Sequence, residues 1–159
     1  MKALLNILER DALMPRSDIA RLLDLTVEEV ERRIAQLESS GVILGYQTII
    51  NHDLTEEDLV TAVIEVKITP ERSGGFDRIA ERIAKFDEVR SCYLMSGGYD
   101  LLVTVEAPDL RAVAAFVSEK LSPLGSVLST ATHFRLKTYK ENGTLHRLDP
   151  AVERLAVVP

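Results

Sequence analysis

The stretch VRSCYLMSGGYDLLVTVE, residues 89–106, decides how the second half of the chain folds. Two runs rich in Val, Leu, Tyr and Thr flank Gly97 and Gly98, and the second run alternates apolar and polar residues like a half-buried strand. Glycine adopts a positive φ at little cost, which a tight hairpin turn requires. The stretch therefore predicts two antiparallel strands with a tight turn at Gly97-Gly98. Taken alone, Asp100 would cap this turn and Tyr99 would pack against the end of the sheet.

The segments around this hairpin complete an α+β domain. Their apolar patterns predict a strand at 60–69, a helix at 76–83, a second helix from Pro108-Asp109 to Pro123 and a last strand at 127–139. The order β-α-β-β-α-β is typical of a split βαβ domain, with two helices on one face of an antiparallel sheet. The second helix is expected to direct Leu110, Val113 and Phe116 inward. The first strand is only half apolar on its other face, so we expect a second copy to cover that face in a homodimer or larger assembly.

The first fifty residues predict three short helices. Ser17 is expected to cap the second helix, and Thr26 the third, where Thr26 and Glu29 have the spacing of a capping box. Gly41 supplies the C-terminal stop of the third helix. The apolar residues at 42–50 then predict a strand or small wing against the helices.

Three short helices, with a brief connection between the second and third, make a helix-turn-helix whose third helix can enter the major groove. Arg32 and Arg33 can reach phosphates or guanine edges there, and Gln36 can pair with adenine. The alternative is a solvated face whose charges pair locally, for instance Glu28 with Arg32. Acidic residues outnumber basic ones in this segment, so we expect two copies on one duplex.

The length and composition limit the number of domains and the class of protein. The 159 residues suffice for one ordinary domain or two small ones, and a hydrophobic content of 46% with 28% charged residues fits a globular protein. A net charge of −6 counts against a promiscuous nucleic-acid coat. No apolar run approaches a membrane span, and the single cysteine, Cys92, fits a reduced, cytoplasmic setting with no membrane partner.

The sequence offers little support for an enzyme. His52, His133 and His146 lack metal-ligand spacing, and Cys92 has no neighbouring base in the sequence. Neither a phosphate-binding glycine loop nor a Ser or Cys nucleophile motif is present. We therefore expect no catalytic site, metal or cofactor.

The two halves together resemble the feast/famine regulators of the leucine-responsive (Lrp/AsnC) family. Residues 25–43 are similar to the family's L-S-x-x-x-V-x-x-R-I-x-x-L-E-x-x-G-V-I run, and residues 89–101 to its strand, Ser-Gly-x-Tyr/Phe-Asp turn and strand. The resemblance extends to about Asn142. It implies an α+β fold, with a winged helix-turn-helix followed by a ferredoxin-like (ACT-like, RAM) domain. Some haem-pathway decarboxylases resemble the same fold, but their Arg-Arg-Ile-Gly run is replaced here by residues 44–46, Leu-Gly-Tyr.

The resemblance also implies partners and sites. The expected partners are double-stranded DNA, further copies of the chain up to a tetramer or octamer, and a small effector, often an amino acid, held between dimers. The DNA-binding candidates are Ser17, Thr26, Glu28, Glu29, Arg32, Arg33 and Gln36. The effector-binding candidates are Ser96, Gly97, Gly98, Tyr99, Asp100, Thr130 and Thr132. The implied domains are 1–50 for DNA, a linker at 51–59, an effector and assembly domain at 60–140 and a tail at 141–159.

The chemistry of the effector candidates is consistent with an amino acid. Exposed amides of the glycine turn can hold a carboxylate, and Asp100 can hold an α-ammonium. The hydroxyls of Thr130 and Thr132 can add neutral hydrogen bonds, although β-propensity alone also explains threonine in a strand. A second hypothesis remains open for the whole chain, because the acidic third helix also fits a DNA-independent sensor that keeps the winged helix as a scaffold.

Overall fold

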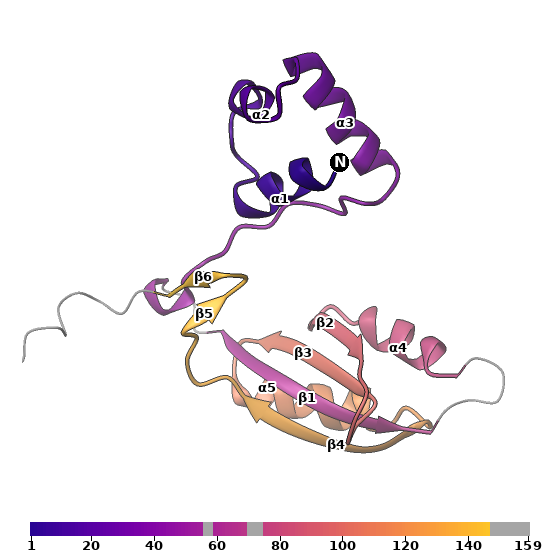
Figure 1. Ribbon diagram of the computed structural model, residues 1–159. Helices are drawn as coiled ribbons and strands as arrows, with labels where there is room; N and C mark the ends of the chain where they lie inside the picture. The colour runs from indigo at the N-terminus through magenta and orange to yellow at the C-terminus, as the bar shows by residue number, and fades with distance from the viewer. Residues whose placement is uncertain (56–58, 70–74, 147–159) are drawn as a thin grey trace, which may run out of the picture. The chain divides into compact units, whose positions relative to one another are not determined.

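The computed structural model describes residues 1–55, 59–69 and 75–146 (Figure 1). The chain forms two compact units, one over Met1–Thr48 and the other from Ile49 onward. Each unit has a buried apolar core of its own.

The N-terminal unit consists of helices α1 (Lys2–Arg10), α2 (Arg16–Leu23) and α3 (Val27–Ser39). Each helix carries an apolar stripe at helical spacing, and the stripes meet in one core. The buried members of that core are Leu4, Leu8, Ile19, Ala20, Val30, Ile34 and Leu37. α2 ends at Asp24, whose left-handed conformation (φ 53°) redirects the chain into α3. This arrangement confirms the predicted helix-turn-helix.

The two ends of α3 are formed as the sequence predicts. The hydroxyl of Thr26 accepts the N–H of Glu29 at 3.2 Å, which satisfies one orphan donor of the first turn. At the other end Gly41 has a φ of 73°, and the N–H of Val42 reaches the carbonyl of Leu37 at 2.9 Å, as in a Schellman motif. The capping box, however, is only half formed, because the side chain of Glu29 binds elsewhere.

The prediction that Ser17 caps α2 is wrong. α2 begins at Arg16, and its N-cap is Pro15, which makes no side-chain hydrogen bond. The carbonyl of Pro15 accepts the N–H groups of Asp18 (2.9 Å) and Ile19 (3.1 Å). Since proline already holds a φ of −54° there, the helix starts before Ser17, which lies exposed within its first turn.

The prediction of a strand or wing at 42–50 is also wrong. These residues have no regular secondary structure, and Val42, Leu44 and Tyr46 are exposed. Ile43 packs on the helical core, and the Tyr46 hydroxyl donates to Glu38 Oε1 at 2.9 Å. A strand needs a neighbouring strand for its backbone groups, and none of the described residues pairs with this segment. Apolar content alone does not make a wing.

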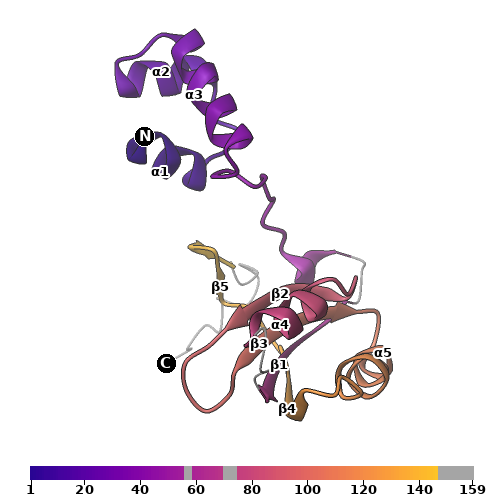
Figure 2. The same cartoon turned by 90° about the vertical axis from the view of Figure 1, so that its right-hand side faces the viewer.

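The second unit contains a four-stranded antiparallel sheet in the order β2-β3-β1-β4 (Figures 1 and 2). The strands are β1 (Val60–Ile68), β2 (Val89–Leu94), β3 (Leu101–Ala107) and β4 (Val127–Phe134). A single 3-10 turn, η1 (His52–Leu54), precedes β1. The strand order and the βαββαβ sequence of elements confirm the predicted ferredoxin-like α+β fold.

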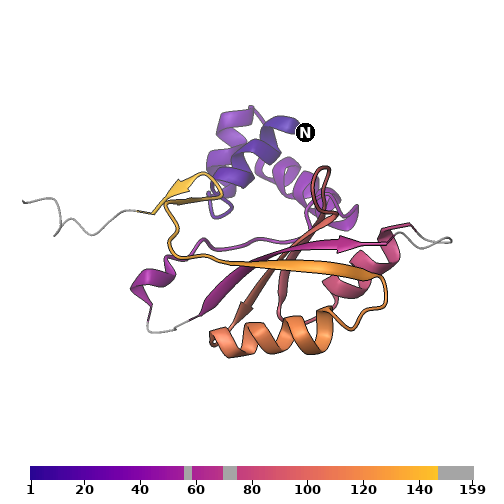
Figure 3. The ribbon, with the colours of Figure 1, turned by 90° about the horizontal axis from the view of Figure 1, so that it is seen from below.

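One face of the sheet is covered by α4 (Asp77–Ala84) and by α5 (Leu110–Ala115), which continues as a π-helical turn, η2 (Phe116–Leu121) (Figure 3). Alternate residues of β1 and β3 point into the core beneath these helices. The side chain of Asp109 caps α5 by accepting the N–H of Ala112 at 2.7 Å. Leu110, which was expected to point inward, is 58% exposed because it occupies the first turn of α5, away from the sheet.

The hairpin of β2 and β3 is present, but its turn is wider than predicted. The strands end at Leu94 and resume at Leu101, and Gly97 alone of the two glycines has a positive φ, 134°. The N–H of Met95 bonds the carbonyl of Asp100 at 2.8 Å, which closes the loop at its base. A two-residue turn is therefore replaced by a loop, because Asp100 is engaged with β1 rather than with a tight turn.

The last strand ends at Phe134 rather than at Tyr139, because β1, its partner, begins only at Val60. The chain then forms a small hairpin of β5 (Lys140–Glu141) and β6 (Thr144–Leu145) around Asn142 and Gly143, both at positive φ. An Asn-Gly pair is a strong hairpin signal that the sequence interpretation missed. Pro150, Val152 and Leu155 predict a short helix in the tail, and that segment lies outside the described residues.

Candidate DNA-binding and effector sites

The exposed side of α3 brings three of the predicted DNA-binding residues together. Arg32, Arg33 and Gln36 line one small hollow of about 100 Å³ between α1 and α3. Arg32 and Gln36 are exposed and Arg33 is half-buried, whereas the opposite side of the helix is in the core. Helical spacing thus presents two guanidinium groups and one amide on the same side of the third helix, as DNA readout requires.

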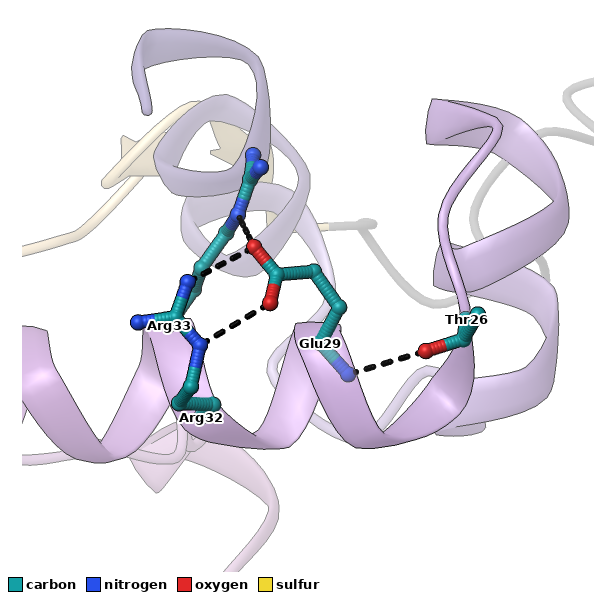
Figure 4. A network of polar contacts seen from close by, with 4 residues as sticks. All are labelled: Thr26, Glu29, Arg32 and Arg33. Carbon is teal, nitrogen blue, oxygen red and sulfur yellow. Dashed lines mark hydrogen bonds and ion pairs between the residues drawn. The ribbon is translucent and has the colours of Figure 1, made fainter.

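The carboxylate of Glu29 forms hydrogen bonds with the guanidinium groups of both arginines (Figure 4). Its Oε1 accepts hydrogen bonds from Arg32 Nη2 at 2.8 Å and from Arg33 Nε at 2.7 Å, and its Oε2 accepts from Arg32 Nε at 2.9 Å. These hydrogen bonds lower the pKa of Glu29 to about 2, with Arg32 the larger cause. The carboxylate is therefore ionised near neutral pH, and it occupies Nε and Nη2 of Arg32 and Nε of Arg33.

The other DNA-binding candidates either make hydrogen bonds within the first turn of α3 or lie on a different helix. The hydroxyl of Thr26 serves the N-cap of α3. The pKa of Glu28 is lowered by its own backbone N–H and by the Thr26 hydroxyl, so this carboxylate also adds negative charge to the start of the helix. Ser17 lies on α2. Of the seven candidates, the structure gathers Arg32, Arg33 and Gln36 with Glu29 between them.

The loop between β2 and β3 exposes its backbone. Ser96, Gly97 and Gly98 are exposed, and Tyr99 is half-buried. Among the residues that the structure describes, none accepts a backbone hydrogen bond from the N–H groups of residues 96–99. A cluster of unpaired amides with a glycine at positive φ is a suitable site for a carboxylate.

Asp100 ties this loop to the end of β1. Its Oδ2 accepts the N–H of Ile68 at 2.8 Å, and its own N–H donates to the carbonyl of Val66 at 3.0 Å. The hydrogen-bond ladder between β1 and β3 ends at the pair Val66 and Leu101. Beyond that pair, the side chain of Asp100 supplies the acceptor for the backbone N–H of Ile68. The prediction that Asp100 caps the turn is thus correct in part: its side chain does accept a backbone hydrogen bond, but from β1 rather than from the turn.

Sheet register places Thr130 near this loop. Leu101, Val66 and Thr130 form one row across three strands, and Thr132 lies opposite Ile64, one step further from the loop. Because residues directly opposite each other share a face, both threonines lie on the helix-covered face, where they are half-buried on the edge strand. The loop and Thr130 therefore lie at the same end of the sheet, with β1 between them.

The structure also contains a polar cavity that the sequence interpretation did not find. It lies in the second unit, has a volume of about 140 Å³, and includes His52, Thr61, Arg135, Lys137 and His146 in its wall. These residues come from the segment before β1, from β1, and from the chain after β4. Their separation in the sequence explains why no local motif indicated the cavity, although two of the three histidines line it.

Two further features bear on the other predictions. Cys92 is half-buried, and burial raises the pKa of its thiol, which is opposite to the shift that activates a nucleophile. In the part of the chain that the structure describes, no helix is long and apolar enough to cross a membrane.

Comparisons with known proteins agree with this architecture. Residues 2–38 match the AsnC-type helix-turn-helix domain, and residues 61–145 match the Lrp/AsnC ligand binding domain. The chain is 43% identical over 157 residues to YugG, an uncharacterized HTH-type transcriptional regulator of Bacillus subtilis, a match that covers 98% of this chain and 95% of that protein. It is 31% identical over 139 residues to the transcriptional regulator LrpA of Pyrococcus abyssi, which covers 87% of this chain and 96% of that protein.

A solved structure of a feast or famine regulatory protein of M. tuberculosis, in complex with L-methionine, superposes with a TM-score of 0.71. The two chains are 25% identical, and the match covers 88% of this chain and 92% of the other. Both units thus match the same family in the predicted order, and the chain belongs to the Lrp/AsnC family of transcriptional regulators.

Proposed function

We propose that this regulator binds double-stranded DNA through α3, with Arg32, Arg33 and Gln36 as the residues that contact it. The observation that supports this is the gathering of these side chains on the exposed side of the third helix of a helix-turn-helix. Glu29 limits the affinity by holding both arginines. Ser17 lies at the start of α2, and Thr26 and Glu28 lie at the start of α3. The N-termini of helices commonly contact DNA phosphates, and such contacts fix the orientation of the protein on the duplex.

The effector of this protein is an amino acid that binds the loop between β2 and β3. The unpaired amides of Ser96, Gly97, Gly98 and Tyr99 hold its carboxylate, and the carboxylate of Asp100 attracts its ammonium group. Thr130 and Thr132 add hydroxyl groups from β4. The relative from M. tuberculosis that was solved with L-methionine supports this class of ligand.

Two copies of the chain pack by the open face of the sheet. This face carries Val63, Tyr93 and Leu102, and no helix in the described part of the chain covers them. Residues 1–50 bind DNA, 51–59 link the domains, 60–140 bind the effector and assemble, and 141–159 form the tail. Pairs of dimers then associate to tetramers or octamers, which places several copies of α3 on one DNA.

Fluorescence anisotropy on the DNA upstream of its own gene tests the proposal. We expect tighter binding to this duplex than to a scrambled one, a steep loss of affinity with salt and a shift on addition of an amino-acid pool. The variant Arg33→Ala is expected to lose affinity while the oligomer is retained. Equal, weak binding of both duplexes by the wild type would contradict sequence-specific readout.

One observation favours a second candidate function. Glu29 neutralises both arginines of α3, and the N-terminal unit carries more acidic than basic residues. A protein that senses a small molecule without DNA, and that keeps the helical unit as a scaffold, would show these same features. Salt-independent, sequence-independent behaviour in the anisotropy experiment, together with retained amino-acid binding, would support that function instead.

A further inference from the structure

The polar cavity of the second unit is distinct from the proposed effector loop. Thr61, near the start of β1, lies in the wall of the cavity, whereas Asp100 contacts Val66 and Ile68 near the other end of the same strand. The rest of the wall comes from the chain before β1 and from the chain that follows β4. The two sites therefore lie at opposite ends of β1.

Arg135 holds the wall of the cavity in place. Its Nη2 donates to the hydroxyl of Thr61 at 2.8 Å, its Nη1 donates to Glu141 Oε1 at 3.2 Å, and its backbone N–H donates to the carbonyl of Thr61 at 2.9 Å. Thr61 is itself buried. These bonds join β1 to the β5 strand, so the cavity is formed before any ligand arrives.

Two imidazole nitrogens in this wall lack a partner. His52 Nδ1 and His146 Nε2 are buried, and neither has a hydrogen-bond partner among the residues that the structure describes. The side chain of His146 is only 9% exposed, and the nearest carboxylate oxygen, Glu141 Oε2, stands 3.9 Å away, beyond hydrogen-bond reach. A buried polar group without a partner is costly, so these two nitrogens point to a bound group that supplies the missing bonds.

The charge of the wall indicates which kind of group this is. Arg135 and Lys137 bring two positive charges against the single negative charge of Glu141. In the described part of the chain, no group of three or more His, Cys, Asp or Glu side chains is arranged to hold a metal ion. An acceptor with negative charge satisfies imidazole N–H groups and the excess of positive charge together.

We propose that this cavity binds a small oxyanion, a carboxylate or a phosphate, through His52, His146 and Lys137, with Arg135 as the residue that positions the wall. This goes beyond the proposed function, because the site and the ligand contacts differ from those of the amino-acid loop. Asn51 and His52 lie shortly after the boundary between the two units at Thr48. An anion bound there fixes the first residues of the second unit and so restricts the segment that leads to the DNA-binding helices.

Ring resonances of the three histidines test the site directly in the full-length protein. Sodium phosphate and sodium succinate are titrated separately at constant pH and ionic strength, with sodium chloride as the reference, and the ¹⁵N–¹H signals of the rings are recorded. We expect saturable shifts of His52 and His146, whereas His133, which lies on the open sheet face 3.5 Å from Glu65, serves as the internal control. The anion that gives the saturable response identifies the source, phosphate or carboxylate.

Paired variants separate binding from folding. His146→Leu is expected to weaken binding of the anion about tenfold or more, since it removes a hydrogen-bond donor to a charged group, whereas His133→Leu leaves the affinity unchanged. Asp100→Asn, in the other site, is expected to leave anion binding intact, so failure here and failure of the amino-acid proposal are distinguishable. Shifts that do not saturate, or that affect all three histidines equally in chloride, would overturn the proposal.

Discussion

At the scale of single residues, Glu29 is the side chain that pairs with both arginines of the proposed DNA-binding surface of α3. Its carboxylate makes three hydrogen bonds to the guanidinium groups of Arg32 and Arg33. Because these bonds lower its pKa to about 2, against an ordinary value of 4.5, the carboxylate remains ionised at neutral pH. Its contribution to stability is present above pH 4.5 and is lost only as the pH falls toward 2. A DNA phosphate must therefore compete with Glu29.

Glu29→Gln is expected to tighten DNA binding several-fold. The substitution keeps the helix N-terminus compatible with Thr26, removes a charge that repels phosphates, and frees two guanidinium groups. Each additional phosphate that these groups neutralise should steepen the slope of log K against log salt by about 0.9. Glu31→Gln is the matched control, because it removes the same charge from an exposed position of the same helix. Identical affinities and slopes for the two variants would show that the pairing of Glu29 does not limit binding.

Asp100 has a structural and a proposed binding role, and two substitutions separate them. Asp100→Ala leaves the buried N–H of Ile68 without its 2.8 Å acceptor and should lower the free energy of unfolding by about 1–3 kcal/mol. Asp100→Asn keeps an acceptor oxygen and should cost less, while it removes the charge that attracts an ammonium group. Urea unfolding and amino-acid titration of both variants check this. Full amino-acid affinity in the stable Asn variant would exclude the ammonium contact.

At the scale of elements, the sequence predicts those whose signals are local. The cap of α3 at Thr26, the stop at Gly41 and the apolar stripes of the helices depend on residues within one or two turns, and all are present. Two of the predictions that fail depend on partners elsewhere in the chain, whereas the Ser17 cap fails locally, because α2 already begins after Pro15. Residues 42–50 have the composition of a strand, but no strand among the described residues lies beside them. The turn at Gly97 is wider than predicted because the side chain of Asp100 accepts a hydrogen bond from Ile68 of β1, and the local sequence does not reveal this contact.

The candidate sites also divide into features that the local sequence predicts and features that depend on distant parts of the chain. Arg32, Arg33 and Gln36 could be placed on one side of α3 from helical spacing alone, whereas their pairing with Glu29 required side-chain geometry. The polar cavity brings together His52, Thr61 and His146, whose spacing in the sequence carries no periodic pattern. Only the register of the sheet and the hairpin after β4 bring these residues to one place.

The loop between β2 and β3 offers a matched pair of glycines. A Cβ at Gly97 or at Gly98 meets no atom within 4 Å, but Gly97 has a φ of 134° and Gly98 lies outside the left-handed region. Gly97→Ala should therefore lower the free energy of unfolding by about 1 kcal/mol or more through backbone strain, and Gly98→Ala should stay within about 0.5 kcal/mol of wild type. Chemical unfolding measures both. Equal effects would show that the loop conformation is not set by Gly97.

At the scale of the whole molecule, the open face of the sheet is the surface through which we propose that two copies associate. This face carries the half-buried side chains of Val63 and Leu102 and that of Tyr93, which is 57% exposed, and they alternate with the polar residues Glu65 and Thr104. Arg90 pairs with Glu106 on β3, and the imidazole of His133 lies 3.5 Å from the carboxylate of Glu65. Apolar side chains mixed with polar ones are the usual composition of protein interfaces. In a two-fold symmetric dimer each of these residues would meet the same face of the second copy.

Leu102→Lys is expected to dissociate the dimer without unfolding the chain. The introduced ammonium group would stand opposite Glu65 on β1 and can pair with it in the monomer, whereas burial of this charge in an interface should raise the dissociation constant about 100-fold. Leu110→Lys makes the same change at an exposed position on α5, on the helical side, and should leave the dimer intact. Sedimentation velocity with circular dichroism measures assembly and folding together. If the Leu102 variant sediments as the wild type does, the open face is not the interface, and affinity for DNA must then arise from another arrangement of the copies.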